Sequence, residues 1–163
     1  MSVNTFGRAF RISALVIAVG FFSAACSGEE ELSRVTAGSV SGTWTGGNGG
    51  TMTLQADHRF STSGIDWGTA SAGSGCPRGE GDGIWAFWGS DPDSPETSSA
   101  LEKYTEGDTV NLSFNGVEQG SCLINLNVIE GGSTLCVSDD IEVPCSLDLR
   151  FTKAGADAGR KNP

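Results

Sequence analysis

Short segments in which apolar and polar residues alternate recur along this 163-residue chain, and they constrain its fold more than any other feature. In the segment 110–114, Val, Leu and Phe alternate with Asn and Ser, and the same pattern runs through 122–128. A period of two places the apolar side chains on one face of a β-strand. The segment 84–88 is apolar on both faces, which predicts a central strand.

About eight such strands follow one another, with turn residues between them and little helix. The expected strands cover 41–45, 51–56, 60–65, 84–88, 110–114, 122–128, 134–137 and 147–151. Ser94 and Pro95 predict the start of one short helix that reaches Tyr104, because Ser caps helices and Pro suits the first helical position. Serial strands joined by short turns predict an all-β fold, an antiparallel up-and-down β-barrel, with a β-sandwich as the alternative.

Four cysteines lie within this expected β-domain, at Cys76, Cys122, Cys136 and Cys145. A hairpin would bring Cys136 opposite Cys145, and Cys76 would then pair with Cys122, although four cysteines allow three connectivities. A zinc site is not expected, because there is no Cys-x-x-Cys spacing and the one histidine is remote in sequence. Two disulfides suit a small domain in an oxidising compartment.

The N-terminus has the layout of a secretory signal peptide. Arg8 and Arg11 precede the apolar run 12–22, which is too short to span a membrane, and small residues at 23–25 lead into Cys26. This ending resembles the lipobox of bacterial lipoproteins, in which the cysteine becomes the lipid-bearing first residue. The resemblance implies two acyl chains on Cys26, enough for a stable anchor. Ser23, where the family has an aliphatic residue, keeps ordinary cleavage and free secretion as the alternative.

The expected organisation is a signal peptide at 1–25, a lipidated Cys26 with a flexible linker to residue 40, a barrel domain at 41–153 and a disordered tail at 154–163. The signal peptide would form the N-terminal helix. Without it, the chain has 8 basic and 20 acidic residues, a net charge of −12. Such a charge disfavours binding to nucleic acid. The expected location is the extracytoplasmic face of the cell membrane, with the lipid on Cys26 as the contact.

Gly42, Thr43 and Trp44 resemble the Gly-x-Trp signature that opens the first strand of lipocalins and related small barrels. Arg150 stands where those families place an Arg that covers the Trp, so the resemblance implies that Trp44 and Arg150 close one barrel end. It also implies a barrel interior that binds a small, hydrophobic ligand. A core Trp and a surface Arg are the alternative. As a whole, the chain looks most like small uncharacterised lipoproteins of Gram-positive bacteria, a likeness that implies no activity.

No catalytic group is expected. His58, the one histidine, lies in a predicted turn beside Asp57, and no nucleophile elbow or phosphate loop is present. The acidic segment 91–96 lacks the ligand spacing of a calcium loop. The sequence therefore predicts no enzyme, no cofactor and no metal site.

Three functions stay open. In the first, the barrel binds a small ligand, with Trp67, Trp85, Phe87 and Trp88 as candidate lining residues beside Trp44. In the second, an envelope structural or protein-interaction lipoprotein has a packed interior and works through the loops 68–83 and 89–100. The third is a hydrolase of unknown substrate. A cavity lined by small inward side chains would mark the first function, and a filled core with an exposed apolar patch would mark the second.

Overall fold

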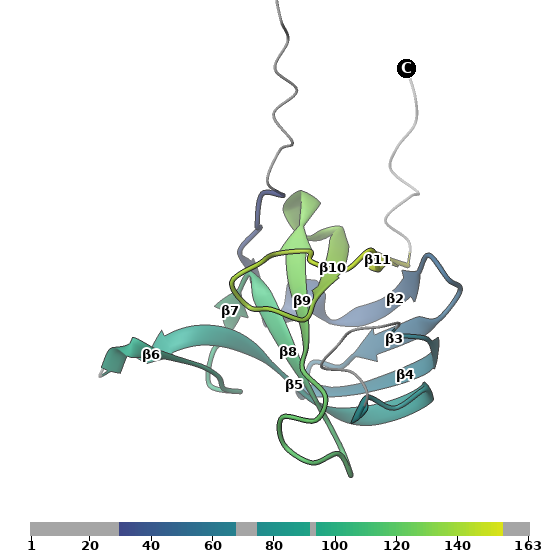
Figure 1. Ribbon diagram of the computed structural model, residues 1–163. Helices are drawn as coiled ribbons and strands as arrows, with labels where there is room; N and C mark the ends of the chain where they lie inside the picture. The colour runs from purple at the N-terminus through teal and green to yellow at the C-terminus, as the bar shows by residue number, and fades with distance from the viewer. Residues whose placement is uncertain (1–29, 68–74, 92–93, 155–163) are drawn as a thin grey trace, which may run out of the picture.

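The computed structural model describes residues 30–67, 75–91 and 94–154, and within them eight strands close into an antiparallel β-barrel (Figure 1). Every barrel strand pairs with the next one along the barrel, and the last returns to the first, so the up-and-down meander is confirmed. The expected signal peptide, Cys26 and most of the tail lie outside the described residues. The barrel strands are β2 (Gly42–Gly46), β3 (Thr51–Leu54), β4 (Arg59–Ile65), β5 (Gly79–Asp91), β8 (Thr109–Phe114), β9 (Ile124–Ile129), β10 (Thr134–Ser138) and β11 (Arg150–Lys153).

The alternating apolar residues form one continuous core inside the barrel. Each strand turns every second side chain inward, so the period read from the sequence sets which residues meet. The largest fully buried side chains are Trp44, Trp85, Phe60, Phe87, Phe151, Met52, Leu54, Ile65, Leu112, Ile124, Leu126 and Ile129.

The sequence predicts a flexible linker up to residue 40, but the N-terminal segment packs against the barrel from residue 30 onward. Leu32 bridges to Ile129, and β1 (Val35–Thr36) pairs with β7 (Glu106–Gly107). The short helix α1 (Ala37–Val40) follows and buries Val40 completely. Leu32 and Val35 are partly buried and Val40 is fully buried, so apolar side chains of this segment pack against the barrel.

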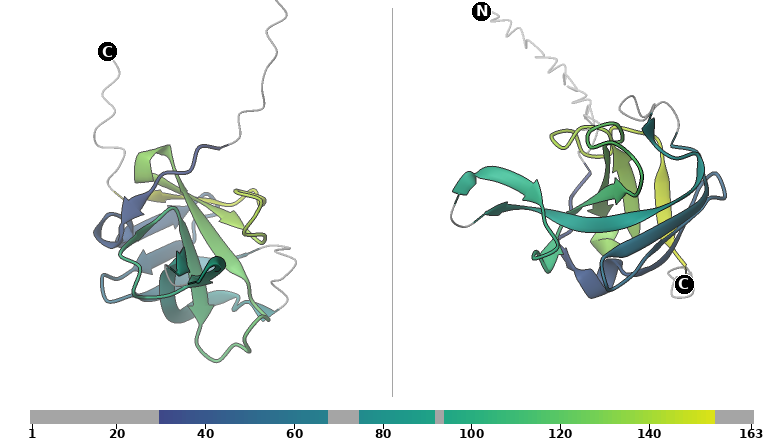
Figure 2. Two further views of the ribbon diagram at one scale, coloured as in Figure 1. Left: turned by 90° about the vertical axis from the view of Figure 1, so that its left-hand side faces the viewer. Right: turned by 90° about the horizontal axis from the view of Figure 1, so that it is seen from below.

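The segment that follows β5 forms strand β6 (Ser94–Ala100), so the expected helix from Ser94 to Tyr104 is wrong. Strand β4 pairs with β5 only up to Ile84, which leaves the same edge of β5 open further along, and β6 pairs there through Trp88 and Ala100. Ser and Thr are weak helix formers, so pairing with the open edge of β5 decides that this segment is a strand. The β5–β6 ribbon projects beyond the barrel (Figure 2).

Both expected disulfides are confirmed, as Cys76–Cys122 and Cys136–Cys145. Cys136 alternates with the inward Leu135 and Val137, so its sulfur lies on the outer side of β10. The bond to Cys145 therefore holds the chain after β10 against the outside of the barrel. In the described part of the chain, no helix is long and apolar enough to cross a membrane.

Candidate functional site

Three of the four candidate ligand-lining residues belong to the packed interior. Trp85 and Phe87 are fully buried and meet edge to face, with ring centroids 5.5 Å apart. Trp67 is 4% exposed, and its ring centroid lies 5.9 Å from that of Phe114 and 6.1 Å from that of Phe151. These aromatic contacts fill interior space with the protein's own side chains.

The structure does not bring Trp44 and Arg150 together. The Arg150 guanidinium lies 2.8 Å from the Glu30 carboxylate, because Phe151 faces inward and its neighbour must face out. Lys153 takes the expected place instead, with its ammonium 5.5 Å from the centroid of the Trp44 ring. Burial lowers the pKa of the Lys153 ammonium below its usual value.

Trp88 is the exception among the four candidates, because it faces outward. It follows the inward Phe87, so its indole lies on the outer side of β5 and is half-buried. The indole Nε1–H donates to Asn125 Oδ1 of β9 at 2.8 Å. Asn111 of β8, which lies between the two strands in the sheet, donates from Nδ2 to the same oxygen at 3.1 Å. Three neighbouring strands thus contribute to one polar network.

The chemistry of the indole decides how these amides are oriented. An indole N–H can only donate, so the Asn125 atom that faces it is the carbonyl oxygen. The Asn111 carbonyl oxygen then accepts a hydrogen bond from Ser113 Oγ at 3.3 Å. Asn125 is 5% exposed, and none of the described residues accepts a hydrogen bond from its Nδ2. An available amide donor is therefore left at the surface of this network.

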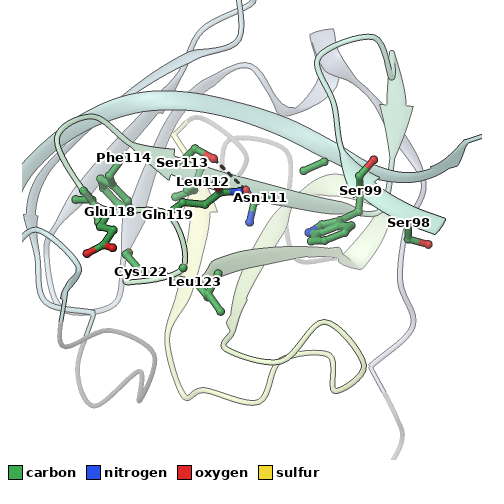
Figure 3. Close-up of a pocket in the computed structure, with 14 residues that line it drawn as sticks. Ser98, Ser99, Asn111, Leu112, Ser113, Phe114, Glu118, Gln119, Cys122 and Leu123 are labelled. Atoms are coloured by element: carbon green, nitrogen blue, oxygen red, sulfur yellow. Dashed lines mark hydrogen bonds between the residues drawn. The ribbon is translucent and has the colours of Figure 1, made fainter.

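Two hollows adjoin on the outside of the barrel and share Trp88, Asn111 and Leu123. The first, of about 480 Å³, lies between β6, the outer face of β8 and the loop 117–123 (Figure 3). The second, of about 550 Å³, lies over Asn125 and reaches the segment 139–141. We call both together the outer groove. Its principal residues are Trp88, Ser98, Ser99, Asn111, Ser113, Glu118, Gln119, Leu123, Asn125, Asp139, Asp140 and Ile141.

The walls of the outer groove are acidic and apolar. Glu118, Asp139 and Asp140 line it, and no Lys or Arg does so among the residues of the two hollows. Leu123 is 44% exposed and Ile141 41% exposed, although both are large apolar side chains. The groove therefore suits a ligand that carries no negative charge and has some apolar surface.

Each disulfide holds one wall of the groove. Cys122 precedes Leu123, so its bond to Cys76 fixes the end of the loop 117–123. The Cys136–Cys145 bond fixes the segment 139–145, and Cys145 N–H donates to the buried Asn127 Oδ1 at 3.1 Å. The Cys136–Cys145 bond cross-links one wall to β10, and the Cys76–Cys122 bond cross-links the other to the chain just before β5, which limits how far the walls can move apart.

His58 has a structural position. Its ring stacks on Trp85 with centroids 4.4 Å apart, and its Nδ1 lies 3.1 Å from the Trp85 carbonyl oxygen. Within the described ranges, no cluster of three His, Cys, Asp or Glu side chains could hold a metal ion. Of the loops expected to form a working surface, 68–74 lies outside the described residues and 94–100 is strand β6.

The sequence identifies Trp88 but not its partners. Asn111 and Asn125 occupy outward positions of two alternating strands, and the recurrence of Asn at such positions was the available signal. Only the fold reveals that Asn125 lies within reach of Trp88, 37 residues away in sequence. Comparison with protein-family models, with curated proteins and with solved structures found no match for this chain.

Proposed function

We propose that this protein is a lipid-anchored, extracytoplasmic binding protein that holds its ligand in the outer groove rather than inside the barrel. One observation carries the proposal. The outward Trp88, Asn111 and Asn125 form a network with an available donor at a groove, whereas the inward positions hold large side chains in mutual contact.

The packed interior supports a site on the outside. A ligand inside the barrel needs space that small inward residues leave open. Here Trp44, Phe60, Trp85 and Phe87 are each 2% exposed or less, and they belong to one core cluster. Opening that core for a ligand would separate contacts worth several kcal/mol, on the order of those lost when a large buried side chain is removed.

The docked N-terminal segment supports an anchor close to the barrel. Glu30 pairs with Arg150 and Leu32 bridges to Ile129, so the chain is held from residue 30. Three residues separate Glu30 from Cys26, so the four Cα–Cα steps between them span at most about 14 Å when fully extended. The chain enters at one end of the barrel, and the groove loop 117–123 lies at the opposite end (Figure 1). A lipid on Cys26 would then leave the groove directed away from the membrane.

Native mass spectrometry of the protein purified from its own host tests the binding site. We expect a bound mass that is lost on denaturation, kept in Ile84→Ala and lost in Trp88→Ala. Ile84 is the matched control because it is an exposed, outward residue of the same strand that does not line the groove. A wild-type protein without a bound mass, or a bound mass that survives Trp88→Ala, would contradict the proposed site.

Metabolic labelling with an alkyne analogue of palmitate tests the anchor separately. We expect label on the wild-type protein and none on Cys26→Ala. An unlabelled wild-type protein in the culture medium would instead support free secretion, and it would leave the binding proposal standing.

A further inference from the structure

We infer that the ligand of the outer groove is a neutral oligosaccharide, held by contact with Trp88 and by hydrogen bonds from the amides of Asn111 and Asn125. The inference rests on the proposed function, because it names the class of ligand for the same groove. It follows from four properties of the groove: the direction of its free donors, its charge, its apolar surfaces and the pairing of its strands.

The floor of the groove offers amide donors to a ligand. Asn125 Oδ1 already accepts from Trp88 and Asn111, and Asn111 Oδ1 accepts from Ser113. Three amide hydrogens of this network have no acceptor among the described residues: both on Asn125 Nδ2 and the second one on Asn111 Nδ2. A complementary ligand must present several oxygen acceptors to this floor.

The walls require that these oxygens be neutral. Glu118 and Asp140 line the groove, and no Lys or Arg is among the described residues that line it, so a phosphate or carboxylate ligand would be repelled. The carboxylates of the walls accept hydrogen bonds, whereas the amide N–H groups of the floor donate them. A hydroxyl group satisfies both, since it accepts from an amide and donates to a carboxylate. A molecule rich in hydroxyl groups therefore matches floor and walls together.

Apolar surfaces complete the match. The C–H faces of a sugar ring are apolar, and Trp88, Leu123 and Ile141 offer apolar area around the polar floor. The hydrogen bond from Trp88 to Asn125 holds the indole before any ligand arrives, which reduces the entropy lost on binding. The two hollows share Trp88, Asn111 and Leu123, so a ligand of several rings would contact both.

The pairing of the floor strands disfavours an extended peptide. Peptides that add to a sheet do so through a free backbone edge. Strand β8 is paired on both sides, with β5 and β9, and β9 is paired with β8 and β10. The floor itself therefore recognises a ligand through side chains alone, and among the strands that line the groove the free backbone edge belongs to β6 in one wall.

The test is titration of the ¹⁵N-labelled mature chain from Ser27 onward, which contains every described residue. The probes are chitotetraose, cellotetraose, maltotetraose and mannotetraose, with tetra-alanine as the peptide probe. We expect at least one tetrasaccharide to shift the indole resonance of Trp88 and the side-chain amide resonances of Asn111 and Asn125. This readout uses the wild-type protein, so it does not depend on the folding of a variant.

Two substitutions with the same charge change sharpen the test. Asn125→Asp keeps an acceptor for Trp88 but removes the amide donors, and we expect it to weaken binding by about tenfold or more. Asn48→Asp is the matched control, because Asn48 is exposed in the β2–β3 turn and its Oδ1 accepts a hydrogen bond that Asp also accepts. It should bind as the wild type does.

Three results would overturn the inference: no shift with any tetrasaccharide, shifts confined to residues outside the groove, or binding of tetra-alanine alone. A host-derived mass that requires Trp88 but is not a saccharide would overturn the oligosaccharide while leaving the proposed site intact. If the wild-type protein shows neither a host-derived mass nor a shift with any tetrasaccharide, the proposed site and the oligosaccharide inference are both overturned.

Discussion

The two disulfides should differ in how much they stabilise the fold, because they close loops of very different length. Cys76–Cys122 joins residues 46 positions apart, and Cys136–Cys145 joins residues 9 positions apart. A cross-link restricts the unfolded chain, and the restriction grows with the logarithm of loop length. We therefore compare two double variants, Cys76→Ala with Cys122→Ala, and Cys136→Ala with Cys145→Ala.

The loop lengths set the magnitude. In the chain-entropy model the longer loop contributes about 4.0 kcal/mol and the shorter one about 2.6 kcal/mol at 25 °C. Each double variant loses two sulfur atoms, so the packing loss enters both and largely cancels in the comparison. We expect the variant without Cys76–Cys122 to be less stable than the other by about 1.4 kcal/mol.

Urea unfolding of the oxidised mature chain, followed by tryptophan fluorescence, measures this difference. The buried Trp44 and Trp85 should report the loss of the core in all three proteins. Each free energy of unfolding is taken with its own m value, because removing a cross-link exposes more surface in the unfolded chain. Equal losses in the two double variants, or a larger loss without Cys136–Cys145, would refute the loop-length reasoning.

Three further predictions concern single residues. Gly83→Ala would place a Cβ 2.0 Å from the Ser113 carbonyl oxygen, so we expect the free energy of unfolding in urea to fall by about 3 kcal/mol or more. Gly47→Ala is the control, because a Cβ there meets open space, and it should change the free energy of unfolding by under about 0.5 kcal/mol. Burial lowers the pKa of Lys153, so the unfolded state holds that proton more tightly than the folded state does. The free energy of unfolding of the wild type should therefore rise relative to that of Lys153→Met as the pH increases toward the usual pKa of 10.5. A difference in unfolding free energy between the two proteins that stays flat from about pH 8 to 11 would contradict this. Glu30→Ala removes an exposed ion pair and should cost under about 1 kcal/mol, and a larger loss of thermal stability would show that the docked segment holds the barrel together.

The barrel and its inward face could be predicted from the sequence because they depend on a local pattern. In 110–114 and 122–128 each inward residue is two positions from the next, and the structure buries Leu112, Ile124 and Leu126 accordingly. The pairing of Cys136 with Cys145 also follows from closeness in sequence. These are features that a strand shows before it meets its neighbours.

Features that depend on a distant partner were not predictable. The segment 94–100 is polar and suits a strand only because β5 runs past the end of β4 and leaves an edge open. The segment 30–40 docks because Leu32, Val35 and Val40 find positions on strands and loops that lie far along the chain. Lys153, rather than Arg150, lies over Trp44 because the register of β11 turns Phe151 inward.

The all-β meander, the inward side chains and the placement of Trp88 on a strand could all be predicted from the sequence, because each depends on a repeat of two residues. The outward direction of Trp88 and its contact with Asn125 and Asn111 at the outer groove became visible in the folded barrel. Alternation within a strand defines two faces, but it does not define which strands become neighbours. Neighbours are decided by strand pairing, and the pairing of β8 with both β5 and β9 brings together side chains 37 residues apart.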